Sequence, residues 1–121
     1  MSLRTKRATA TIAINTALSQ AICLGDAVLC AIQMSAGWDA AALTFQVSDD
    51  QGVTWQELRD ASGTAITVAS PTAGYRIELD ASDFKSAVFL KVRSGTSGSA
   101  VNQTGAARVL TIISRKFYPV S

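Results

Sequence analysis

Alternation of apolar and polar residues over short stretches most limits how this chain can fold. In Leu43–Ser48, Tyr75–Asp80 and Val88–Arg93 every second residue is apolar, and the residues between them are mostly polar. Side chains of a β-strand point alternately to two faces, so each stretch predicts a strand with one buried and one wetter face. Because a helical period of 3.6 residues is hard to find elsewhere, the chain is predicted to be all-β.

Short β-branched runs separated by Gly, Asp, Ser and Pro predict about eight strands. They are expected at Ala8–Asn15, Ala27–Ser35, Ala41–Ser48, Val53–Arg59, Thr64–Ala69, Gly74–Leu79, Ala87–Ser94 and Ala106–Lys116. Short antiparallel strands at nearly regular spacing favour a jelly-roll-like, two-sheet sandwich over a barrel with a ligand cavity. One helical turn is expected at Asp80–Lys85, capped by Asp80 or Ser82.

The last predicted strand carries apolar residues on both faces, with Val109 and Ile113 on one and Leu110 and Ile112 on the other. Such a strand is expected to be central in a sheet or covered by a second subunit, which predicts a homo-oligomer. The preceding segment, Ser94–Gly105, is rich in Gly and Ser and is predicted to be a mobile connection instead of a tight hairpin. Exposed connections often carry binding residues.

Size and composition predict a single domain. The chain has 121 residues, of which 48% are hydrophobic and 17% charged, enough apolar material for a core. We expect one β-sandwich domain over residues 8–121, preceded by a basic N-terminal arm at residues 1–7 that contains Arg4, Lys6 and Arg7. The net charge of +2, with its basic clusters near the ends, argues against a nucleic-acid partner.

The sequence also bears on location. The longest purely apolar run, Ala27 to Ile32, is far shorter than the roughly 20 residues of a membrane-spanning helix, so no membrane insertion is expected. The N-terminal residues lack a continuous apolar signal core. The chain is therefore expected to be made in the cytoplasm.

Residue types limit the available chemistry. The sequence has no histidine, which removes the commonest general base and every zinc site that uses imidazole. The only cysteines are Cys23 and Cys30, and Cys30 shares strand parity with Ile32 and is expected to be buried; a Cys23–Cys30 bridge is the other reading. We expect no metal site, because Asp39, Asp49 and Asp50 lack the acidic spacing of a calcium loop. We also expect no catalytic residue and no cofactor.

The octapeptide SDDQGVTW, Ser48 to Trp55, follows one predicted strand and leads into the next. Ser48 and Asp50 have short side chains that accept backbone N–H groups within a turn, and Gly52 allows a positive φ. Thr54 suits a strand, and Trp55 can lay its ring over the turn while its indole N–H finds an acceptor. All five residues are thus predicted to hold a hairpin.

The octapeptide resembles the Asp-box hairpin of sialidases, where it recurs at the corners of propeller blades away from the active site. Here the pattern occurs once. A sialidase also needs an arginine cluster and a tyrosine nucleophile with an acidic partner, and no spacing makes Tyr75 and Glu78 such a pair. The resemblance implies a turn and not a catalytic activity.

A wider resemblance is carried by Trp38–Ser48, Asp50–Leu58, Val92–Thr96, Val101–Gln103 and Arg108–Ile112. These segments resemble small β-sandwich proteins of tailed phages, prophages and gene transfer agents. The resemblance implies a non-enzymatic accessory part of the virion, such as a decoration, spike, fibre or tail component. It implies self-assembly and contacts with other virion proteins, and it carries over no catalytic residue.

Two further function classes stay open. Trp38, Trp55 and Tyr75 are the candidate binding residues of a carbohydrate- or receptor-binding module, whose partner would be a cell-surface glycan. The opposing interpretation of the two tryptophans is packing at a hairpin or sheet edge. An enzyme is the third class, and the missing histidine argues against it.

Overall fold

The computed structural model describes residues 4–116, which contain nine β-strands and a single 3-10 helix, η1. The elements are β1 (Arg4–Ile12), β2 (Ile22–Cys23), β3 (Val28–Gln33), β4 (Leu43–Ser48), β5 (Gln56–Glu57), β6 (Arg76–Glu78), η1 (Ala81–Phe84), β7 (Phe89–Thr96), β8 (Ser99–Ala100) and β9 (Arg108–Lys116). The prediction of an all-β chain is confirmed.

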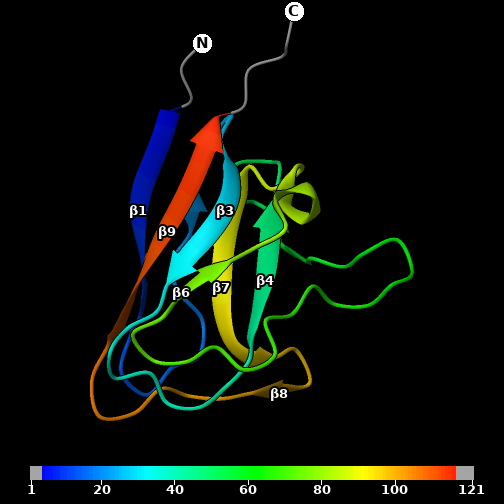
Figure 1. Ribbon diagram of the computed structural model, residues 1–121. Helices are drawn as coiled ribbons and strands as arrows, with labels where there is room; N and C mark the ends of the chain where they lie inside the picture. The colour runs from blue at the N-terminus through cyan, green and yellow to red at the C-terminus, as the bar shows by residue number, and fades with distance from the viewer. Residues whose placement is uncertain (1–3, 117–121) are drawn as a thin grey trace, which may run out of the picture.

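The strands form two antiparallel sheets that pack as a sandwich (Figure 1). One sheet has the order β1-β9-β3-β6, and the other has the order β2-β7-β4-β5 with β8 paired to β7. Apart from the extra β8 hairpin, early strands pair with late ones in a nested series: β1 with β9, β2 with β7, β3 with β6, and β4 with β5. This nesting is a long hairpin rolled up into two sheets, the jelly-roll arrangement expected from the sequence.

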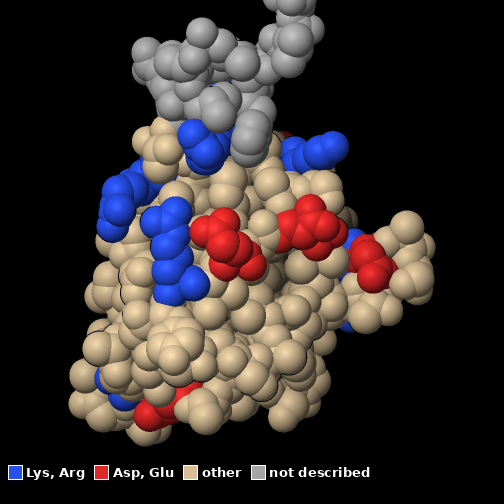
Figure 2. All heavy atoms as spheres, viewed as in Figure 1, with Lys and Arg blue, Asp and Glu red and all other residues tan. Residues whose placement is uncertain are grey.

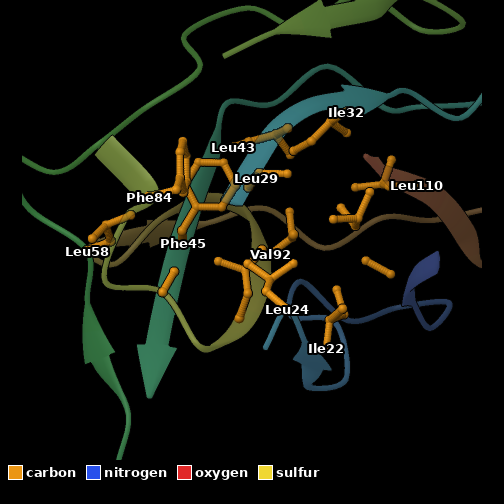
Figure 3. Close-up of a cluster of buried hydrophobic side chains, with 14 of the residues drawn as sticks. Ile22, Leu24, Leu29, Ile32, Leu43, Phe45, Leu58, Phe84, Val92 and Leu110 are labelled. Carbon is orange, nitrogen blue, oxygen red and sulfur yellow. The ribbon is translucent and has the colours of Figure 1, made fainter. Parts of the chain in front are cut away.

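The core lies between the sheets and contains the inward residues of two of the three alternating stretches. In the third, Tyr75–Asp80, the prediction of a buried face is wrong for Tyr75, which is 62% exposed, while Ile77 and Leu79 are partly buried. Leu43 and Phe45 of β4 and Leu90 and Val92 of β7 are fully buried, as their two-residue period predicts. Phe84 of η1 closes one side, where its ring meets that of Phe45 edge-to-face at 5.1 Å between centroids (Figure 3). The Asp80 carboxylate caps η1 by accepting the Ser82 N–H at 3.0 Å, as predicted.

β9 lies between β1 and β3, as its two apolar faces led us to expect. Leu110 and Ile112 point into the core, with 0% and 1% of their surface exposed. On the outer face Ile113 is only 3% exposed, whereas Val109 is 49% exposed. Most of the surplus apolar surface of β9 is thus covered within one chain, so this strand gives less reason for a second subunit than its sequence suggests.

Several predicted boundaries are wrong. Of Val53–Arg59 only β5 pairs as a strand, and Thr64–Ala69 makes only two isolated bridges, Arg59 with Ala65 and Leu43 with Val68. The short strands β2 and β8 were not predicted. Residues 4–7 of the expected basic arm are part of β1 and pair with β9 over Ile113–Lys116, while residues 1–3 lie outside the described part. The backbone of these residues pairs with β9 while the side chains of Lys6 and Arg7 stay exposed to solvent, so basic residues are compatible with a strand here.

Within residues 4–116 there is no helix long and apolar enough to cross a membrane.

Candidate functional site

The Ser48–Trp55 hairpin is held by side-chain hydrogen bonds inside the turn. The Ser48 hydroxyl oxygen accepts the Gly52 N–H at 2.9 Å, and the same hydroxyl donates to the Asp50 carboxylate at 2.6 Å. Asp50 also accepts the Thr54 N–H at 2.9 Å and the Thr54 hydroxyl. Gly52 has a φ of 84°, a conformation that a side chain would strain. These contacts agree with the folding roles that the octapeptide suggests.

The Asp50 carboxylate is held ionised by its neighbours. Hydrogen bonds from the Ser48 hydroxyl and then from Thr54 lower the pKa of Asp50 to about 2. A carboxyl group with such a pKa has no proton to donate near neutral pH. Asp50 is therefore suited to accept hydrogen bonds in the turn and unsuited to act as a general acid.

The Trp55 ring is engaged within the chain. Its indole N–H donates to the Gly52 carbonyl at 3.0 Å, which lays the ring over the turn. The Lys91 ammonium from β7 lies 4.5 Å from the ring centroid, a cation–π contact. A sugar that stacked on this face of the ring would have to displace Lys91.

The three candidate binding residues do not form one surface. Trp38 is 7% exposed, and its indole N–H donates to the Ala41 carbonyl at 3.3 Å. Trp38 precedes β4 and Trp55 follows it, so the two tryptophans belong to opposite ends of that strand. Tyr75, which is 62% exposed, precedes β6 in the other sheet. Of the three residues, Trp38 is buried, Trp55 is half-buried and Tyr75 is exposed.

The segment Ser94–Gly105 differs from its prediction as a mobile connection. β7 runs on to Thr96 and pairs with β8, so residues 96–99 make a tight hairpin. The Gln103 side chain is fully buried: its amide accepts the Asp39 N–H at 2.8 Å and donates to the Asp39 carbonyl at 3.1 Å and to the Ser94 hydroxyl at 2.9 Å. Together with the Thr104 N–H, which donates to the Asp39 carboxylate at 2.7 Å, this buried amide ties the segment to the loop before β4.

A buried ion pair was also missed in the sequence. Arg93 is 7% exposed on the outer face of the five-stranded sheet, where it donates to the Thr44 hydroxyl at 3.0 Å and forms a salt bridge with Glu57. The alternation assigned Arg93 to a wetter face. Only the pairing of β4 with both β5 and β7 brings these three residues together, and nothing in the local sequence signals it.

The outer face of the four-stranded sheet has a hollow of about 370 Å³. It is lined by Thr5, Cys30, Arg76, Glu78, Leu79, Ala81, Ile113 and Arg115. Figure 2 shows basic and acidic side chains meeting on this side of the molecule, and one such pair is Arg76 with Glu78 at 3.5 Å. Because the charges are already matched in part, the hollow has no strong preference for either sign.

Cys30 lies in this hollow and not in the core. The pairing of β3 with β9 shifts register between Leu29 and Ala31, which makes Cys30 the extra residue of a β-bulge and reverses its parity. Partial burial raises the pKa of the Cys30 thiol. Cys30 and Cys23 are both free thiols, so the alternative of a bridge between them is wrong. Among residues 4–116, no three His, Cys, Asp or Glu side chains gather as metal ligands.

Comparisons with known proteins add no relative. No protein-family model, no curated protein and no solved structure matches this chain.

Proposed function

We propose that this chain is a non-enzymatic structural subunit of a phage or phage-like particle, where it acts by assembling with copies of itself and with other virion proteins. The observation that carries the proposal is the nested pairing of its strands. Jelly rolls of two antiparallel sheets are widespread in viral capsid proteins, and also in lectins. This support is an analogy of fold, which joins the resemblance of Trp38–Ile112 to virion accessory proteins.

The use of the acidic side chains also supports a structural role. Asp50, Asp60 and Asp80 each accept hydrogen bonds from Ser or Thr residues two or four positions away, from Ser48 and Thr54 in the case of Asp50, and these bonds lower the pKa of each carboxyl group. The Asp60 turn lies in the loop that projects from the body after β5 (Figure 1). Carboxylates that are bonded within their own turns fix the conformation of the loops, and loops of fixed conformation suit a subunit that assembles through its surface.

A carbohydrate-binding role has less support. Lectins share the jelly roll, and the exposed Tyr75 could contact a sugar ring. However, Trp38 is buried, and Trp55 is half-buried with the Lys91 ammonium over its ring. A glycan array with the intact chain tests this alternative, and binding that is lost in Tyr75→Ala but kept in Tyr75→Phe would favour it.

Association with particles is the direct test. Particles would be purified by density gradient from the cells that make this chain, and their proteins counted by mass spectrometry. We expect the chain in the particle fraction in several copies per particle. Its absence from intact particles, or turnover of sialoside or other glycoside substrates that is lost in Glu78→Gln, would contradict the proposal.

Self-assembly is tested separately by light scattering at micromolar concentration. We expect a mass of at least twice 12.7 kDa. A strict monomer would restrict the proposal to assembly with other virion proteins.

A further inference from the structure

β1 is the one long edge strand in the described part of the chain. It spans nine residues and pairs with β9 along its whole length on one side. The other edge strands, β2, β5 and β6, have only two or three residues each. In Figure 1, β1 forms the outer margin of its sheet. A long edge offers unpaired backbone groups to an added strand unless something covers them.

Gln20 covers the second half of this edge. Its side-chain amide accepts the Thr11 N–H at 2.8 Å and donates to the Thr9 carbonyl at 3.0 Å. The amide thus occupies the two positions that the backbone of a neighbouring strand would take. These bonds also identify the residues whose backbone groups face away from β9, because such residues alternate along an antiparallel strand.

By that alternation, the backbone N–H and C=O groups of Thr5 and Arg7 face the same open side as those of Thr9 and Thr11. The register of β1 with β9 has no bulge between these residues, so the alternation holds throughout. Within residues 4–116 no hydrogen-bond partner is found for the edge-facing groups of Thr5 and Arg7. The open edge is therefore a short stretch that ends at Gln20, made of the N–H and C=O groups of Thr5 and Arg7 and the N–H of Thr9.

The side chains on this stretch determine what can pair with it. Lys6 and Arg7 are both exposed. If a second copy paired antiparallel over Thr5–Arg7, Lys6 would lie opposite its own counterpart, or Arg7 opposite its own, and like charges directly opposite destabilise a strand pair. An extended segment with carboxylates at alternating positions carries them all on one face, where they lie beside Arg7 or beside Lys6 and provide the opposite charge.

We propose that Thr5–Arg7 of β1 is a docking edge for an extended acidic segment of another protein, and that Gln20 limits the docking to this stretch. Added-strand recognition takes its affinity from main-chain hydrogen bonds and its specificity from side chains. This docking edge adds the chemistry of a partner to the proposed function. It rests on that function in one respect, that the partner is a virion protein.

The test uses two capped synthetic hexapeptides, one of alternating Glu and Val and one of alternating Lys and Val, added to the intact ¹⁵N-labelled chain. We expect the Glu peptide to shift the Thr5 and Arg7 amide signals and to slow their hydrogen exchange. The Lys peptide should leave both unchanged. Equal effects from the two peptides, or effects confined to other strands, would overturn the proposal.

Three variants locate the contact. Thr5→Pro removes an edge-facing N–H and no bond to β9, so it should abolish binding of the Glu peptide. Arg7→Glu should weaken binding about tenfold, whereas the matched charge reversal Arg59→Glu on the projecting loop should leave it unchanged. Gln20→Ala should extend the protected stretch to Thr9 and Thr11. Should Thr5→Pro fail to fold, the Arg7→Glu and Arg59→Glu pair still decides: equal affinities overturn the proposal.

Self-pairing is a distinct outcome of the same experiment. Exchange protection of Thr5 and Arg7 that rises with protein concentration and without peptide would show a second copy on this edge, and would overturn the choice of a different partner. Failure of the peptide to bind would refute the docking edge and would leave the particle test of the proposed function unaffected.

Discussion

The Ser48–Trp55 hairpin and the Ser94–Gly105 segment are both loops rich in small polar residues, yet only the first could be interpreted from its own sequence. In the first, Ser48, Asp50 and Thr54 bond to one another and to the turn backbone within four residues. In the second, Gln103 bonds to Asp39, 64 residues away. A short-range bond is encoded by residue type and spacing, whereas a long-range bond needs a partner that only the fold supplies.

The glycines of the two loops differ in the same way. A Cβ on Gly52 would meet only the Trp55 ring, at 3.5 Å, which is an ordinary contact. A Cβ on Gly95 would lie 2.5 Å from the Ser99 carbonyl oxygen and 2.7 Å from the Val101 nitrogen. Both glycines have positive φ, but only Gly95 is also required by backbone packed against it. Substitutions in the two loops should therefore differ in the free energy of unfolding that they cost, with the larger losses in Ser94–Gly105.

Gly95→Ala should destabilise most, because it adds a backbone clash to an unfavourable φ. We expect a loss of about 3 kcal/mol or more in the free energy of unfolding, measured by urea denaturation. Gly98→Ala is the matched control, since a Cβ there meets nothing within 4 Å. Equal losses in the two variants would show that β7 and β8 do not form the hairpin described.

Gln103→Ala should come next. It leaves the partly buried Asp39 N–H and the buried Ser94 hydroxyl without their partner, and we expect a loss of about 2–3 kcal/mol. The neighbouring Asn102→Ala, an exposed change, should alter the free energy of unfolding by less than about 0.5 kcal/mol. If Gln103→Ala were as mild as its neighbour, Ser94–Gly105 would be the mobile connection that its composition suggests.

Gly52→Val tests the local loop. Here a Cβ makes only an ordinary contact with Trp55, so the strain is mainly in the backbone, and we expect a loss of about 1–2 kcal/mol in the same denaturation experiment. A loss as large as that of Gly95→Ala would mean that the Ser48–Trp55 turn also depends on distant packing. Gly63→Val, at a positive φ in the projecting loop with open space around it, is the control for backbone strain.

Asp50→Ala should have the smallest effect at neutral pH and a characteristic dependence on pH. The folded pKa of Asp50, about 2, lies below its ordinary value of 3.8. The carboxylate therefore contributes stability above the higher value, and the contribution is lost as the pH falls through the lower one. Between these values the stability of the variant should fall less steeply than that of the unchanged chain. Parallel curves would contradict the turn bonds of Asp50.

The sequence by itself determined the sheets' inward faces and the local turns. The two-residue period of Leu43–Ser48 and Val88–Arg93 predicted which side chains enter the core. The Asp80 cap could be predicted because its acceptor and donor are two residues apart. The jelly roll could be expected for the same reason: alternating strands at regular spacing have few ways to cover both inward faces.

The tertiary structure alone decided the positions where pairing overrides the local pattern. The bulge in β3 turned Cys30 outward because β9 imposes its own register on that strand. Arg93 became buried because Thr44 and Glu57 reach it from neighbouring strands. Gln20 meets Thr9 and Thr11 across a chain reversal that no short window of sequence contains. In each case the partner that the fold brings to the residue determines whether it is buried, exposed or bound, because a polar or charged side chain is buried at low cost only when it is paired.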